Sequence, residues 1–268
     1  MKDIKKAVLC ASLSVVIAGF ISGCGGGGGG DYGGSSGGSV YTPPPAPPTS
    51  EGVYVGTASN GLFIETLVLE NGQTYALYGT QTNSAYFVTG VIEGVGATSG
   101  TNFSIANLKD FSSNGAVVSG SFVATVNPGV SLTGTLIEAG GQVTFPGLAP
   151  LGSSYVYASA PNLSLITGSW SGNLLIAGEP VNFTIGTNGS VTGLSAGNCS
   201  FAGTIAPRAS GKNVFDFNIT FGAPPCALPN QAASGSAISY LLSNGQRQII
   251  MAGADSTGAH GSVVFAVR

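Results

Sequence analysis

The sequence predicts an all-β protein with two tandem homologous domains, each an up-and-down antiparallel β-barrel-like fold of about eight strands, after a disordered Gly/Pro-rich tether. Three observations predict this. Short apolar runs are broken every 8 to 12 residues by Gly, Asn, Ser or Pro. No stretch after the first segment has a convincing helical periodicity. The two halves of the chain also share short motifs in the same order and at similar spacing, which indicates an internal repeat.

Residues 1–23 are typical of a secretory signal peptide. Three lysines give a positive start, residues 7–21 form an apolar stretch of 15 residues, and the small residues Ser22 and Gly23 follow. A stretch of this length is too short to span a bilayer, which takes about 20 residues. An exported protein is therefore expected.

The tetrapeptide Ile21-Ser22-Gly23-Cys24 resembles the lipobox of bacterial lipoproteins. The resemblance implies that the Cys24 sulfur receives a diacylglyceryl group and that Cys24 becomes the new N-terminus, so that acyl chains hold the protein on a membrane. In such lipoproteins Asp after the cysteine favours the inner membrane. Gly25 stands there instead, which predicts an outer-membrane location, facing either the periplasm or the cell exterior. An ordinary signal peptide with a stray cysteine, or an uncleaved anchor, is the alternative.

Residues 24–50 contain the lipidated cysteine and a linker that has no means of burying a core. Six consecutive glycines follow Cys24, and a proline-rich stretch at residues 43–48 is expected to be extended polyproline II. The glycines give freedom next to the lipid, and the prolines act as a spacer. A proline-rich ligand for a binding module is the alternative reading.

The internal repeat divides the rest of the chain into residues 51–150, a connector at 151–167, and residues 168–268. Six matches recur in the same order with offsets of 111 to 120 residues, more than chance explains in a Gly/Ser-rich chain. The matched segments are 52–56 with 168–172, 71–72 with 188–189, 87–92 with 201–205, 99–102 with 210–213, 119–121 with 234–236, and 141–145 with 261–265.

Eight strands are expected in each domain, as the second one shows best. Its segment 215–221 alternates apolar and polar residues, so one face is dry and the other wet. Asn-Gly pairs at Asn188 and Asn244 favour hairpins, and closure into a filled barrel removes free sheet edges. A two-sheet sandwich is the alternative. The expected strands are 168–177, 180–186, 189–194, 199–206, 213–222, 233–243, 246–254 and 259–267.

Four cysteines occur, and two of them remain for the folded domains. Cys10 is lost with the signal peptide and Cys24 is lipidated. An oxidising compartment should join Cys199 and Cys226 in a structural disulfide. A metal site would need more Cys or His nearby, and a redox pair is usually closer in sequence.

Charge indicates no nucleic-acid partner. Without residues 1–23 the chain keeps 5 basic and 10 acidic side chains, and no basic stripe exists. The first domain is acidic and the second carries most of the basic residues. A simple difference in surface composition is the favoured explanation of this asymmetry, and opposite signs that help the two domains dock are the alternative.

No motif predicts catalysis, a cofactor or a metal site. His260 is the single histidine, lies in a Gly-rich turn, and has no carboxylate and no nucleophile at motif spacing. The carboxylates are scattered, and only loss of activity on replacing Glu65 or Asp216 would revive a hydrolase. The aromatic residues are candidates for core packing or for a sugar- or protein-binding surface. They are Tyr75, Tyr78, Tyr86, Tyr155, Tyr157 and Trp170.

These observations predict a non-catalytic envelope lipoprotein, anchored through Cys24, that binds an unidentified protein or glycan partner or has a structural role. Its ligand-binding residues are not predicted. A lipocalin-like carrier of a small apolar ligand is the alternative, which requires a hollow barrel with a dry interior. An integral outer-membrane barrel is less consistent with the short strands and the terminal residues Ala266, Val267 and Arg268.

Overall fold

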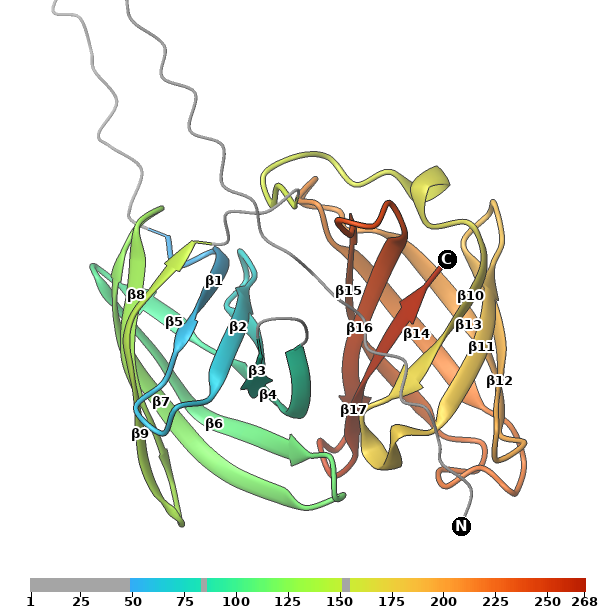
Figure 1. Ribbon diagram of the computed structural model, residues 1–268, viewed down its shortest axis with the longest axis horizontal. Helices are drawn as coiled ribbons and strands as arrows, with labels where there is room; N and C mark the ends of the chain where they lie inside the picture. Colours follow the sequence, from blue (N-terminus) through green and yellow to red (C-terminus); the bar gives the residue numbers. More distant parts are fainter. Residues whose placement is uncertain (1–48, 83–85, 151–154) are drawn as a thin grey trace, which may run out of the picture.

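The computed structural model describes residues 49–82, 86–150 and 155–268 of the chain. Within these ranges the protein is built from antiparallel strands with two short 3-10 turns, and no α-helix occurs. Nor is any helix of this part long and apolar enough to cross a membrane. The strands form two barrels in tandem, which lie side by side (Figure 1). The predicted all-β fold class is confirmed, while the expected signal peptide, Cys24 and tether lie outside the described residues.

Barrel one is a sheet closed by pairing of its fourth and sixth strands. The strands β4 and β5 both pair with β6, so together they fill one strand position, interrupted at Gly96. A Cβ at Gly96 would lie 2.3 Å from the Phe103 ring, so only glycine fits there. The strands are β1 (Gly52–Thr57), β2 (Phe63–Val68), β3 (Gln73–Gln81), β4 (Tyr86–Val95), β5 (Ala97–Ser99), β6 (Asn102–Ser112), β7 (Val117–Asn127), β8 (Ser131–Glu138) and β9 (Gly141–Pro150).

Barrel two is a closed barrel of eight strands in sequence order, as an up-and-down meander requires. Each observed strand begins and ends within three residues of its expected bounds, and the sandwich alternative is excluded. The strands are β10 (Gly168–Leu174), β11 (Pro180–Ile185), β12 (Ser190–Ser195), β13 (Ser200–Pro207), β14 (Phe215–Phe221), β15 (Ala232–Leu241), β16 (Arg247–Asp255) and β17 (Gly261–Val267), with 3-10 turns η1 (Leu163–Leu165) before β10 and η2 (Ile176–Gly178) after it.

The matched sequence segments lie on corresponding strands or on corresponding connections of the two barrels. The Asn-Gly turn shows why the match is structural. Gly72 joins β2 to β3 with φ +82° and Gly189 joins β11 to β12 with φ +81°, a conformation that favours glycine. In each turn the preceding asparagine side chain accepts a hydrogen bond from a backbone N–H two residues on. The same local chemistry therefore sets the same hairpin in both halves.

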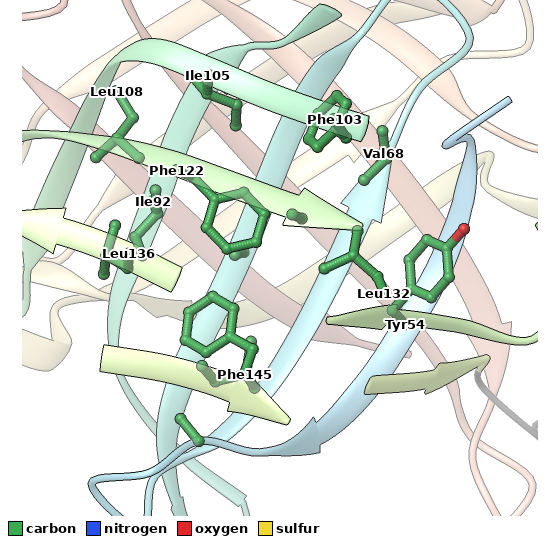
Figure 2. Close-up of a cluster of buried hydrophobic side chains, with 14 of the residues drawn as sticks. Tyr54, Val68, Ile92, Phe103, Ile105, Leu108, Phe122, Leu132, Leu136 and Phe145 are labelled. Carbon is green, nitrogen blue, oxygen red and sulfur yellow. The ribbon is translucent and has the colours of Figure 1, made fainter. Parts of the chain in front are cut away.

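Both barrel interiors are filled by buried side chains. In barrel one, Phe103, Phe122 and Phe145 pack together with aliphatic residues of the surrounding strands (Figure 2). In barrel two, Trp170 stacks on Phe183 with ring centroids 6.4 Å apart. The Trp170 indole N–H donates to the carbonyl of Ile166 at 2.8 Å, so its polar atom is satisfied in the core. The interiors therefore act as packed cores.

Candidate functional site

A third apolar cluster lies between the barrels, and we call it the seam. Strands β1–β4 of barrel one face β15–β17 of barrel two across it (Figure 1). The cluster joins buried residues of both barrels with Tyr155 of the connector. Its members include Val53, Leu67, Leu77 and Val91 from barrel one, and Ile238, Ile250 and Val263 from barrel two.

The strands at the seam bury both of their faces. On β2, Ile64 and Val68 point into barrel one, while Leu67 points into the seam. On β16, Met251 belongs to the core of barrel two and Ile250 to the seam. A strand covered on both sides needs a continuous apolar run in place of alternation. The two barrels therefore share one contiguous packed structure.

Ion pairs join the two barrels at the edge of the seam, which we call its rim. The Arg208 guanidinium, only 10% exposed, donates to Glu70 across the seam at 2.8 Å and to Asp216 of its own barrel at 2.6 Å. Lys212 of barrel two pairs with Glu51 of barrel one at 3.0 Å. Acidic residues of barrel one and basic residues of barrel two therefore meet across the seam in these two pairs.

Two tyrosines of the connector tie it to this rim. The Tyr157 hydroxyl donates to Glu70 at 3.1 Å, and the Lys212 ammonium lies 5.3 Å from the centre of its ring. The Tyr155 hydroxyl donates to the backbone carbonyl of Asn213 at 2.6 Å, and its ring packs edge-on against Tyr240. The connector is therefore held by both barrels.

A glutamate with no cationic partner among the described residues lies in the dry centre of the seam. Glu65 borders a small cavity of about 30 Å³, room for a water molecule, whose other walls are mostly apolar. Burial raises the pKa of Glu65 to about 7. Its charge in turn raises the pKa of Tyr86, Tyr155 and Tyr240, after burial as the main cause. The carboxyl is therefore poised to be neutral in an environment that disfavours charge.

A second buried glutamate, Glu93 on β4, borders a groove at the edge of the seam. Its Oε1 atom is buried and has no hydrogen-bond partner among the described residues, and burial raises its pKa to about 7. The groove has a volume of about 420 Å³ and is lined by both barrels. A shifted carboxyl in a cleft between domains is a candidate functional group.

Barrel one also contains a group of polar side chains, Tyr78, Asp110 and Glu138. The Tyr78 hydroxyl donates to both carboxylate oxygens of Asp110, at 2.8 and 3.0 Å. The pKa of Asp110 is raised by burial, with the Tyr78 hydrogen bond acting against the rise, and burial also raises that of Glu138. The fold thus brings together two carboxyls that are 28 residues apart in sequence.

The structure places the predicted site residues as follows. Cys199 and Cys226 form a disulfide with an S–S distance of 2.07 Å, which joins the β12–β13 loop to the β14–β15 loop. Closing this 27-residue separation stabilises barrel two by about 3 to 4 kcal/mol in the chain-entropy estimate. His260 is 59% exposed and pairs with Asp255 at 2.9 Å, so it has a carboxylate partner that the spacing in the sequence did not indicate. No group of three metal-binding side chains occurs in the described part of the chain.

The six aromatic candidates divide between core and seam. Trp170 lies in the core of barrel two and Tyr78 in barrel one, while Tyr75, Tyr86, Tyr155 and Tyr157 lie at or beside the seam. Sequence reasoning missed Glu93, because nothing in its neighbourhood marks it. The seam itself left one signal in the sequence, the continuous apolar run Leu67-Val68-Leu69, because such a run indicates burial on both faces.

Comparisons with known proteins give no family. No family model matches the sequence, and no curated protein matches it. Among solved structures, a protein of unknown function from the DUF3598 family of Nostoc punctiforme is similar over 81% of this chain and 95% of its own, with 11% sequence identity and a TM-score of 0.24. A likeness at this level carries no argument about function.

Proposed function

We propose that the protein is a non-catalytic lipoprotein of the bacterial envelope, anchored at the outer membrane through Cys24, whose two barrels together present a binding surface. The observation that carries the anchor is Cys24 itself, preceded by a charged start, an apolar stretch and small residues. The shared seam supports the second half of the proposal. Two barrels joined by a common apolar cluster and ion pairs can act as one body at the end of a tether.

The packing of the barrels bears on the carrier alternative. An apolar ligand inside either barrel would have to displace buried side chains such as Phe122 or Trp170. Displacing packed core residues is costly, since truncating one large core residue already costs roughly 3 to 5 kcal/mol. The groove at the seam is the better place for a ligand, because it needs no such displacement.

The anchor is tested by replacing the lipidated cysteine. Cys24→Ser should remove incorporation of labelled palmitate and leave the protein soluble or mislocalised, with the disulfide and the β-sheet circular dichroism signal intact. Cys10→Ser is the matched control, because it changes the other cysteine of the same segment and should leave labelling unaltered. Palmitate labelling or membrane retention unchanged in Cys24→Ser would overturn the proposal.

Orientation is tested by protease treatment of intact cells, followed by a blot for residues 51–268 with a periplasmic control protein. Loss of the signal would place the barrels outside the cell and favour capture of an external partner. Full protection would place them in the periplasm and favour an envelope partner.

A further inference from the structure

The groove at the seam has the size and position of a ligand site. Its volume of about 420 Å³ lies within the range of small-molecule sites, and such sites form preferentially between domains. Strands β3, β4 and β6 of barrel one supply one side, and the end of β16 with the following turn supplies the other. Accessible apolar surface comes from Val95 and Ala254, while Phe111 is buried. Val95 is 67% exposed and so leaves apolar surface available to an occupant.

Glu93 gives the groove a hydrogen-bond acceptor that is not satisfied by the described residues. Its buried Oε1 accepts no hydrogen bond from the described residues. Lys109 stands directly opposite on β6, yet its ammonium donates to Ser119 of β7 at 2.8 Å. The Gln73 amide donates to the Tyr75 hydroxyl. These two neighbouring donors are thus engaged elsewhere, and no described residue donates to Glu93 Oε1.

The other carboxylate of the groove is already satisfied. Asp255 accepts hydrogen bonds from Thr257 and from the backbone N–H of Ala259, and its second oxygen pairs with His260. Burial opposes ionisation of Asp255, but these hydrogen bonds hold its pKa at about 2. Of the two carboxylates, Glu93 is therefore the one with an oxygen that no described residue satisfies.

We propose that this groove binds a ligand with a cationic nitrogen, an ammonium or guanidinium, which donates to Glu93 Oε1 while an apolar part of the ligand lies on Val95 and Ala254. A charged donor both makes the missing hydrogen bond and balances the buried carboxylate. Hydrogen bonds assisted by charge are roughly twice as strong as neutral ones. The inference deepens the proposed binding function by naming a ligand class for it.

Binding should depend on pH, because the ligand needs the ionised form of Glu93. The titratable groups facing Glu93 are Tyr75 on β3, Lys109 on β6, and Asp255 with His260 on the turn after β16. Burial raises the pKa of Glu93 to about 7, so a bound cation should expel a proton below that pH. Affinity should fall about tenfold per pH unit below about 6 and level off above about 8.

The test titrates the full lipidated chain, purified in detergent, with three probes of similar shape and different charge: benzylamine, benzyl alcohol and phenylacetate. Isothermal titration against a detergent blank measures affinity. Benzylamine should bind at least tenfold more tightly than the other two. Equal affinity for benzylamine and benzyl alcohol would overturn the proposal.

Three variants locate the site. Glu93→Gln should weaken benzylamine at least tenfold and remove its pH dependence. Lys109→Met should strengthen it, because the variant removes a like charge beside the site. Glu138→Gln is the matched control, since Glu138 has a buried oxygen without a partner but does not line the groove. Unchanged binding in Glu93→Gln, or equal losses in Glu93→Gln and Glu138→Gln, would overturn the proposal.

A second set of probes separates the two sources of such a cation. Nα-acetyl-lysine methylamide represents a lysine side chain of a partner protein. Binding of this amide at least as tight as that of benzylamine, and lost in Glu93→Gln, would indicate a side chain of a partner. Weaker binding of the amide would indicate a free amine. Failure of the Cys24 labelling test would not affect these titrations, so the anchor and the ligand class fail independently.

Discussion

Within barrel one, strands β2 and β7 each pair with two antiparallel strands, but they differ in what covers their outer faces. On β2, residues of both faces are buried, Val68 in the barrel and Leu67 in the seam. On β7, Phe122 points into the barrel while Val123 on the opposite face is 49% exposed. The difference shows that the second barrel turns the outer face of half of the first barrel into core. The outer face of β7 remains surface.

The outward face of β2 therefore depends on the second barrel for its burial, whereas the outward face of β7 does not. The seam strands carry apolar residues outward that only the other barrel covers, among them Leu67, Leu77 and Val91. Exposing such residues to water costs about 25 cal/mol of free energy per Å² of apolar surface. We therefore expect the outward face of β2 to be far more sensitive to substitution than that of β7.

The largest expected effect is that of a charge placed in the seam. Leu67→Asp should lower the free energy of unfolding by about 4 kcal/mol, because an unpaired carboxylate is buried beside Glu65, where the described residues that line the small cavity include no cation. Val123→Asp, the same chemistry on the exposed face of β7, should change it by about 0.5 kcal/mol or less. Urea unfolding of both variants measures this. Similar losses would mean that the seam is not part of the packed core in solution.

The second-largest expected effect is the pH dependence of stability that comes from Glu65 at the centre of the seam, compared with that from Glu70 at its rim. Between pH 4.5 and about 7 the folded protein keeps a proton on Glu65 that the unfolded chain has released. The free energy of unfolding of the wild type therefore falls as pH rises through this window, by about 3 kcal/mol from this residue. Glu65→Gln should lack that loss, so its advantage over the wild type should grow from near zero at pH 4.5 to about 3 kcal/mol at pH 8.

Glu70→Gln is the control for this pH dependence. Glu70 lies at the rim, and although burial opposes it, the hydrogen bond from Arg208 lowers its pKa. Its charged form is stabilised by folding, so Glu70→Gln should lose stability above its unfolded pKa and show no gain at pH 8. Thermal unfolding at several pH values compares the two variants. A difference between Glu65→Gln and the wild type that does not vary with pH would contradict the prediction.

Local features of the fold could be predicted from the sequence, but contacts between the barrels could not. The alternation in residues 215–221 and the Asn-Gly turns predicted the strands of barrel two within three residues, because each signal is local. Docking of the barrels is not local. An outward apolar residue such as Val91 looks the same in sequence whether water or another domain covers it. Glu93 was missed for the same reason, since its lack of a partner depends on Lys109 bonding to Ser119 on a third strand.

The smallest expected effect concerns the ion pairs of the rim. In a double-mutant cycle of Arg208→Ala and Glu70→Ala, the coupling energy should be about 1 kcal/mol and should shrink at high salt. Arg208 is 10% exposed but Glu70 is 28% exposed, so water can replace much of the lost interaction. The cycle of Arg208 with Asp216 is the comparison, because that pair lies within barrel two and does not cross the seam. A coupling of zero for Arg208 and Glu70 alone would mean that the apolar cluster holds the barrels together without help from this charge pair. A coupling much above 1 kcal/mol would instead make the rim the main determinant of docking, and Leu67→Asp should then cost less than expected.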